Sequence, residues 1–265
     1  AERVLRKINR IVSQNFTWGI RKDTSTLTHF YTHMYKPYVE KRFGPFAIVD
    51  NFYKVRRLFR TGLLVAVSKD TQLVSALICR AIDRVLWLEM IGIENAHIDL
   101  LGEGVGDATS YALLEVAFEM NCTHINFRDS RPFLNDGVLR YKQGWGACLI
   151  NDRKACREIG VQINLSGKIR YNPFFNHYPI FIDQGSLSGF VILSQEKVAT
   201  LRQIRTIKNT FMNPGLRKLH IFSLNGFDEE VYQQFRTAND DVRIIDLTAY
   251  TGSGTMFSDM LNDNP

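Results

Sequence analysis

Apolar residues recur at helical spacing between residues 24 and 42. Four large side chains lie along one side of this predicted helix: Tyr31, Met34, Tyr35 and Tyr38. Proline has no N–H, and its ring clashes with the preceding turn of a helix. Pro37 is therefore expected to break or kink this one. The pattern predicts an interrupted helix with one buried side.

Three strand-like runs come next: "GLLVAVSK" (62–69), "QLVSALICR" (72–80) and "RVLWLEMIGI" (84–93). Only the short polar links "DT" and "AID" separate them. Links of this length join strands that run in opposite directions. We therefore expect the three runs to pair consecutively as an antiparallel meander.

A glycine-rich stretch, "LGEGVG" (101–106), then leads into a second helix, which Asp107 can cap. Helical spacing continues through Ala112, Leu113, Val116, Ala117 and Met120. "THINF" (123–127) has the character of a buried strand, and "ACLIN" (147–151) is predicted to be a further strand. Together these elements predict a mixed α/β domain.

The rest of the chain alternates regularly between strands and helices. Strands are predicted at 189–194, 218–224 and 242–247, and helices at 195–212 and 228–238. Such β-α-β-α-β alternation predicts a small parallel sheet. We place the boundary in the loop "YNPFFNHYPIFIDQGS", which divides the chain into a domain of residues 1–180 and a smaller one of 181–265, ending in a loose polar tail.

Composition restricts the class of protein without identifying a function. Apolar residues make up 45% of the chain and charged residues 23%, as in an ordinary globular protein, and no apolar run is long enough for a membrane span. The four cysteines, Cys79, Cys122, Cys148 and Cys156, form no C-x-x-C pair, which favours free thiols in a reducing cytoplasm. A net charge of +6 is compatible with an anionic ligand or nucleic acid.

The stretch "RDSRPFLNDGVLRYKQGWG" (128–146) concentrates chemistry directly after a predicted strand. Asn135 or Asp136 can cap a helix over 137–143. A turn and a helix do not explain the four polar residues at the end of the strand, where α/β folds usually place chemistry: Arg128, Asp129, Ser130 and Arg131.

This stretch resembles the signature of the GNAT-fold acyltransferases, and most of all their FemAB-like branch. In that branch a serine-containing turn precedes a lysine and a Trp-Gly pair, as Ser130, Lys142, Trp145 and Gly146 do here. The order of helix, meander, loop, helix and strand fits as well. The resemblance covers residues 25–155 and implies a GNAT-like central mixed sheet flanked by helices.

The resemblance also implies an activity, transfer of an acyl or aminoacyl group from an activated donor to an amine acceptor. It implies acyl-coenzyme A as a co-substrate with no tightly bound cofactor, and aminoacyl-tRNA as the alternative donor. The glycines that would hold the pyrophosphate at the helix N-terminus, beside Asp107, are Gly102, Gly104 and Gly106. Leu101 stands where the family has Arg or Gln, and Glu103 adds a negative charge.

Two carboxylates are candidates for the base that accepts the amine proton. Glu89 lies in an apolar strand, where burial would raise the pKa of a carboxyl; alternatively its side chain lies on a solvated face. Asp129 ends a buried strand, whereas Asp136 fits a helix cap better than a substrate contact. Ser130 could donate a hydrogen bond to a carbonyl oxygen, and Tyr141 could protonate the leaving thiolate or belong to the core.

Basic and aromatic residues complete the candidate site. The candidates for substrate binding are Arg128, Arg131, Lys142 and Trp145. For Arg131 and Lys142, the alternative is a solvated position on the surface. His29 and His33 have the spacing of metal ligands on a helix, but no third ligand accompanies them, and we expect no metal site.

Two other functions remain open. The departures at Leu101 and Glu103 favour a binding or scaffold module that keeps a GNAT-like shell without catalysis. An RNA-associated protein, with tRNA as the partner of interest, could instead use the basic face of helix 195–212, although such a face is usually only the solvated side of the helix. Its cations are Lys197, Arg202, Arg205 and Lys208. The oligomeric state does not follow from the sequence.

Overall fold

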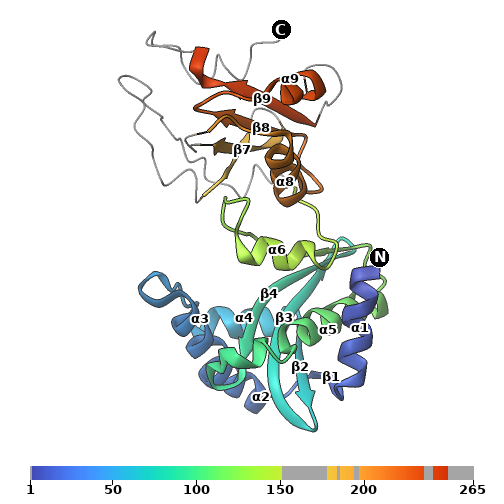
Figure 1. Ribbon diagram of the computed structural model, residues 1–265. Helices are drawn as coiled ribbons and strands as arrows, with labels where there is room; N and C mark the ends of the chain where they lie inside the picture. Colours follow the sequence, from blue (N-terminus) through green and yellow to red (C-terminus); the bar gives the residue numbers. More distant parts are fainter. Residues whose placement is uncertain (1, 151–177, 184–185, 194–196, 236–240, 250–265) are drawn as a thin grey trace. The chain divides into compact units, whose positions relative to one another are not determined.

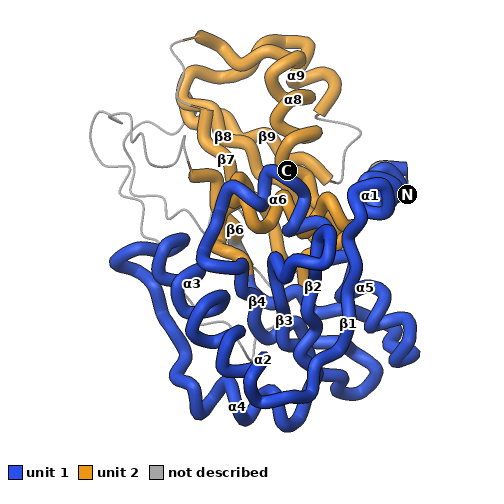
Figure 2. The backbone as a smooth tube through the Cα atoms, turned by 90° about the horizontal axis from the view of Figure 1, so that it is seen from below, with its two compact units in different colours: residues 1–129 blue, residues 130–265 orange. Residues whose placement is uncertain are grey.

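The computed structural model describes residues 2–150, 178–183, 186–193, 197–235 and 241–249. The chain divides into two compact units, Ala1–Asp129 and Ser130–Pro265, which Figure 2 colours separately. Each unit holds its own sheet, labelled with its helices in Figure 1. The predicted fold class, a mixed α/β protein with helices flanking sheets, is confirmed.

Unit 1 contains a five-stranded sheet in sequence order, formed by β1 (Phe16–Arg21), β2 (Leu63–Lys69), β3 (Gln72–Ile82), β4 (Val85–Ile93) and β5 (His124–Asn126). β1 to β4 pair antiparallel, and β5 runs parallel to β4. The predicted meander is therefore confirmed. Its second link is shorter than expected, because β3 continues to Ile82 and the turn is made by Asp83 and Arg84, with φ of 50° and 61°.

Three helical elements follow one another without a break: α2 (Thr24–His29), the π-helix η1 (Phe30–Tyr35) and α3 (Lys36–Phe43). The 3₁₀ turn η2 (Gly44–Phe46) comes next, and α4 (Phe52–Thr61) begins after a short connection. Pro37 lies in the first turn of α3, and the wider π turn directly before it is the interruption expected there. Met34, Tyr35 and Tyr38 are buried, as predicted.

The π-helix packs closely onto the sheet because β4 has a glycine under it. A Cβ added at Gly92 would lie 2.7 Å from both Met34 Cβ and Tyr35 N. Around this contact, one core joins η1, α4 and the sheet; it includes Phe30, Met34, Val55, Leu58, Leu64, Ile78 and Met90. The core holds β4, the strand that carries the candidate site, in place.

The glycine-rich stretch leads into the longest helix of unit 1. After η3 (Glu94–Ala96) and η4 (Ile98–Leu101), α5 runs from Val105 to Glu119. The prediction that Asp107 caps this helix is wrong. Gly104, with φ of 97°, is the N-cap, so that Asp107 lies in the first turn. α1 (Glu2–Ser13), β1 and α4 were not predicted.

Unit 2 contains α6 (Gly137–Gln143) and a four-stranded sheet in the order β6 (Ile180–Asp183), β7 (Leu187–Leu193), β8 (Lys218–Ser223) and β9 (Val242–Asp246). α8 (Leu201–Phe211) joins β7 to β8, and α9 (Glu229–Phe235) joins β8 to β9, which η5 (Leu247–Ala249) follows. β7, β8 and β9 pair in parallel, as the alternating pattern predicted, whereas β6 pairs antiparallel with β7.

Two predicted elements of unit 2 need correction. Residues 147–150 form no strand, because no ladder of strand hydrogen bonds includes them among the described residues: Ala147 N donates to Lys142 O, Leu149 N donates to Pro214 O, and Cys148 and Ile150 are exposed. The helix predicted from 195 begins at Leu201, where Thr200 and Gln203 form a capping box, so that Val198 lies outside it. Residue 151 of the predicted strand is outside the described residues.

The division into units falls earlier in the chain than the predicted boundary near residue 180. Leu134 is fully buried in the core of unit 2, and its backbone N–H donates to Pro179 O. Packing thus assigns residues 130–149 to unit 2, while the domain ranges 1–180 and 181–265 stay a prediction. Cys156, most of the boundary loop and the polar tail lie outside the described residues.

Among the helices of the described residues, none combines the length and apolar character that crossing a bilayer would need. The three described cysteines, Cys79, Cys122 and Cys148, are free thiols, as expected.

Candidate functional site

β4 contains a bulge at Glu89, one of the candidate site residues. Ile78 of β3 pairs with Met90 and the next residue, Cys79, pairs with Leu88, so Glu89 is left without a partner. An extra residue of this kind bends a strand and turns its side chain in a new direction. Glu89 is thus the extra residue of the bulge, and no residue of β3 lies opposite it.

The Glu89 carboxylate is buried between two arginines. Arg80 donates to Oε1 from Nε at 2.8 Å and from Nη2 at 2.5 Å, and Arg128 Nη2 lies 3.5 Å from Oε2. The Glu89 side chain is 4% exposed, whereas those of Arg80 and Arg128 are 30% and 48% exposed. A buried carboxylate is tolerated when it is paired in this way. The alternative interpretation of the sequence, in which the Glu89 side chain lies on a solvated face, is therefore wrong.

Beside this cluster, β4 and β5 diverge. The parallel pair includes only Val85 with His124, Leu86 with Ile125 and Trp87 with Asn126. From Leu88 to Ile93, no strand in the described part of unit 1 pairs with the edge of β4 that faces β5. At about 3.3 Å per residue, this unpaired edge is about 20 Å long. An unpaired edge presents backbone N–H and C=O groups to a ligand.

The divergence has a local cause in the sequence after β5. Asn126 Oδ1 accepts a 2.7 Å hydrogen bond from Arg128 N, and Arg128 has a φ of 63°. An asparagine that bonds the backbone two residues on makes a turn, which removes the chain from the strand. The same turn brings the Arg128 guanidinium to Glu89. Asp129, which follows, is exposed and ends unit 1.

Cys79, next to the bulge, is not a nucleophile. Burial, with further contributions from Cys122 and Glu89, raises the pKa of its thiol to about 12. A thiol with this pKa is protonated at neutral pH and unreactive. The chemistry available at the bulge is therefore that of the carboxylate, the two guanidiniums and the open backbone edge.

The glycine loop lies at the start of α5, with its carboxylates neutralised. Lys69 Nζ lies 2.9 Å from Glu103 Oε2, and Lys7 Nζ lies 2.7 Å from Asp107 Oδ1. Arg10 of α1 reaches the carbonyl oxygen of Gly102 at 3.5 Å. Since each acidic residue has a lysine partner, Glu103 does not leave an unbalanced negative charge at the helix N-terminus.

The predicted residues after Asp129 belong to unit 2, where the structure brings two of them together. Lys142 is buried, and its Nζ donates to Ser130 Oγ at 3.1 Å. Asp136 caps α6 by accepting from Leu139 N at 2.9 Å, as the capping interpretation predicted. The remaining candidates differ in exposure: Trp145 is buried, Tyr141 is partly buried and Arg131 is exposed.

Of the two helical histidines, His29 contacts a carboxylate, and its ring stacks on that of His33. His29 Nε2 lies 2.9 Å from Glu94 Oε2, and the His29 and His33 rings stack with centroids 4.9 Å apart. Among the described residues, no group of three or more His, Cys, Asp and Glu side chains is placed to hold a metal ion.

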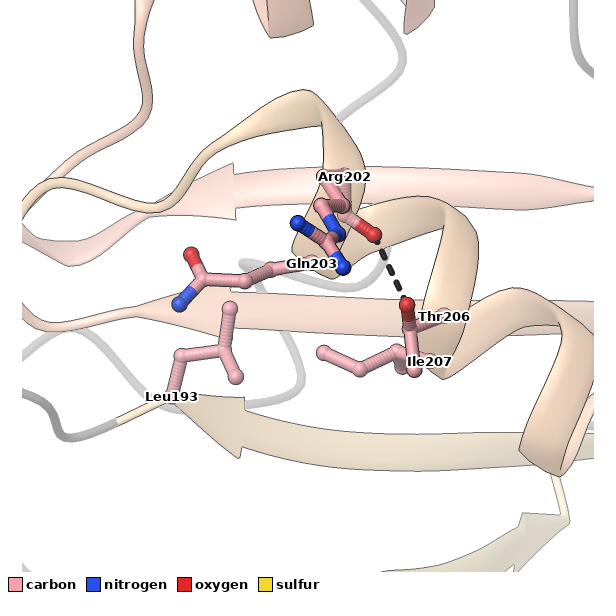
Figure 3. Close-up of a pocket in the computed structure, with 5 residues that line it drawn as sticks. All are labelled: Leu193, Arg202, Gln203, Thr206 and Ile207. Carbon is pink, nitrogen blue, oxygen red and sulfur yellow. Dashed lines mark hydrogen bonds between the residues drawn. The ribbon is translucent and has the colours of Figure 1, made fainter.

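A second candidate position is a surface cavity of about 240 Å³ in unit 2, between α8 and the end of β7. Figure 3 shows its five lining residues, which are Leu193, Arg202, Gln203, Thr206 and Ile207. Two further cations of the basic face of α8 already have partners, because Arg205 donates to Gln234 and Lys208 pairs with Asp241 at 2.8 Å. This reduces the charge that α8 offers to a phosphate backbone.

Sequence reasoning missed Arg80, which completes the buried cluster. An arginine three residues before a hairpin turn and a glutamate five residues after it are not opposite each other in a regular ladder. Arg80 pairs with Trp87, and Glu89 lies two residues further along β4, at a diagonal position that a long side chain can reach. Opposite charges on neighbouring predicted strands were the available signal, and the register of the pair was not.

Comparisons with known proteins give structural likenesses only. No protein-family model matches the chain, and no curated protein matches its sequence. The ribosomal-protein-S18-alanine N-acetyltransferase of Escherichia coli is similar at 15% identity and a TM-score of 0.37, over 49% of this chain and 76% of that chain. A possible acetyltransferase from Clostridium difficile 630 is similar at 9% identity and a TM-score of 0.42, over 55% of this chain and 99% of that chain.

An aminoglycoside N-acetyltransferase in complex with CoA is similar at 12% identity and a TM-score of 0.35, over 53% of this chain and 95% of that chain. These likenesses each cover about half of the chain. They are weak and assign no activity to this chain. The element order that the GNAT-fold resemblance implied, a meander followed by a loop, a helix and a parallel strand, is present in unit 1.

Proposed function

We propose that the protein is an N-acyltransferase, which uses the open edge of β4 to hold an acyl-coenzyme A donor. The observation that carries the proposal is the divergence of β4 and β5 after three residue pairs, next to the buried Glu89. An extended donor arm that contains amide groups can hydrogen-bond to a strand edge as an added strand does. The donor phosphates would lie at the N-terminus of α5, where backbone N–H groups and the helix dipole favour anions.

Charge around the glycine loop supports this orientation. Lys7, Arg10 and Lys69 lie at the loop with two carboxylates, which leaves the group net positive. Coenzyme A supplies the thioester that makes the acyl carbon reactive. The acceptor nitrogen would attack that carbon and form the amide bond as the C–S bond breaks, and the thiolate would leave with the electron pair.

The residues near the bulge would have separate roles. The backbone N–H groups on the β4 edge would stabilise the oxyanion that forms on the thioester carbonyl. Asp129 is the proposed acceptor of the amine proton, and Glu89 would keep Arg80 and Arg128 in place while its own carboxylate is paired. That the protein belongs to the FemAB-like branch, with Ser130 and Lys142 as its paired residues, is part of this proposal.

Thermal unfolding with and without acetyl-coenzyme A, free coenzyme A and a long-chain acyl-coenzyme A tests the proposal. A donor at a hundred times its Kd stabilises a protein by about 2.7 kcal/mol, a readily measured shift of the Tm. We expect the shift with at least one of the three compounds. We also expect Asp129→Asn to keep the shift and to abolish acyl transfer. The absence of any shift would contradict donor binding.

A further inference from the structure

The segment from Lys36 to Arg60 holds most of the net charge of the protein. Its seven basic residues outnumber its acidic residues, Glu40 and Asp50, by five, whereas the net charge of the whole chain is +6. The basic residues are Lys36, Lys41, Arg42, Lys54, Arg56, Arg57 and Arg60. The segment comprises α3, η2 and α4, so one part of unit 1 is strongly cationic.

Among the described residues, most of these cations have no acidic partner. Lys54 pairs with Asp50 at 2.7 Å, and Lys36 lies 4.0 Å from Glu40. Four other cations are exposed, and in the part of the chain that the structure describes their side chains form no ion pair or hydrogen bond; they are Lys41, Arg56, Arg57 and Arg60.

The exposed arginines of α4 share one face of the helix. Tyr53, Arg56, Arg57 and Arg60 have the spacing i, i+3, i+4 and i+7, and this face is opposite the buried Val55 and Leu58. Tyr53 is 77% exposed, so an amphipathic side chain lies among the three cations. Such a face suits a surface that carries many negative charges.

The same segment also exposes bulky apolar side chains, in the connection between α3 and α4. Phe46 is 82% exposed and Ile48 is 85% exposed, although both are in an ordered connection that projects from unit 1 between α3 and α4 in Figure 1. The cause is the alternation of an extended chain, because Ala47 and Val49 pack against the core between α4 and the sheet. Their burial fixes Phe46 and Ile48 on the outer side.

We propose that this surface, formed by Phe46, Ile48 and the basic face of α4, docks on an anionic lipid bilayer. A bilayer interface accepts apolar side chains and attracts cations at the same time. A nucleic acid would use the arginines and could stack on an aromatic ring, but it has no use for the exposed Ile48. The surface thus holds unit 1 at the membrane.

Flotation of the full chain with vesicles tests this proposal. We expect binding to vesicles of equal parts phosphatidylcholine and phosphatidylserine, and little binding to phosphatidylcholine alone. Arg56→Gln with Arg57→Gln should weaken binding about thirtyfold, because each cation near an anionic surface strengthens binding about fivefold. Phe46→Ser with Ile48→Ser should weaken it at least tenfold through loss of buried apolar surface.

Matched controls keep the test specific. Phe118→Ser removes another apolar side chain that is 83% exposed, and Arg202→Gln with Arg205→Gln removes two arginines of α8; both variants should bind vesicles as the unaltered protein does. All variants should keep the original Tm, since the changed side chains are exposed. Equal loss in control and test variants would overturn the proposal. So would tight binding to a single-stranded RNA by a protein that does not float with the vesicles.

Discussion

Replacing His220 by leucine should remove an acid-sensitive part of the stability of unit 2. His220 lies in β8, opposite Phe190 of β7 and Arg243 of β9, and it is 4% exposed. Its Nδ1 atom is buried and has no hydrogen-bond partner among the described residues. Burial, together with the charges of Arg243 and Lys218, lowers the pKa of His220 from 6.5 to about 4.

The sign and size of the effect follow from this difference in pKa. Between pH 6.5 and pH 4 the unfolded chain binds a proton on His220 that the folded chain does not bind. The contribution of His220 is therefore intact above pH 6.5 and is lost as the pH falls through this window. At about 1.4 kcal/mol per pH unit, the free energy of unfolding falls by about 2 kcal/mol by pH 5 and by about 3 kcal/mol below pH 4.

Urea unfolding of the unaltered protein and of His220→Leu at pH 7 and pH 5 measures the effect. The difference in unfolding free energy between the two proteins should change by about 2 kcal/mol between these pH values, in favour of the variant at pH 5. His97→Leu, which replaces an exposed histidine, is the matched control and should show no such change. An equal difference at both pH values would contradict the lowered pKa of His220 in the folded protein.

Three further outcomes are expected in unit 1. Gly92→Ala should lower the free energy of unfolding in urea by about 2 kcal/mol, because its Cβ would lie 2.7 Å from the backbone of η1. Gly19→Ala is the control and should be neutral, because nothing lies within 4 Å of the added Cβ. Equal effects of the two substitutions would contradict this packing. Glu89→Gln should cost about 3 kcal/mol, whereas Glu89→Leu combined with Arg80→Met should cost less, and the reverse order would contradict a buried ion pair. Alkylation of the native protein followed by mass spectrometry should leave Cys79 unmodified until urea is added; modification of the folded protein would contradict its raised pKa.

The strands of the meander could be predicted because their signals are local. Each apolar run is bounded by a short polar link, and the two links that form turns contain Asp70 and Asp83, residues that tolerate positive φ. The same holds for α6, where an aspartate three residues before Leu139 satisfies the free N–H group at the helix start.

The elements that were missed depend on distant partners. β1 contains Gly19 and two charged or polar residues, and it becomes a strand by pairing with β2, which lies more than 40 residues away. The apolar run around Leu149 was predicted to be a strand, but no partner pairs with it in the described part of unit 2. Pairing of this kind is not encoded in any short window of sequence.

The candidate site shows the same division. Glu89 was singled out as a carboxylate within an apolar strand, and Arg128 as one of four polar residues at the end of a predicted strand. Their contact, and the role of Arg80 in it, depends on the register of β3 against β4 and on the turn after β5, which the apolar pattern does not reveal.

Hydrogen exchange at β4 measures whether the unpaired edge of this strand holds the acyl donor. In the free protein, the backbone amides of residues 88–93 that face the unpaired edge should exchange rapidly, while those bonded to β3 exchange slowly. We expect a saturating acyl-coenzyme A to slow the exchange of the edge-facing amides by at least tenfold and to leave the exchange rates of β1 unchanged. Donor binding that protects another part of the chain and leaves residues 88–93 unchanged would contradict it.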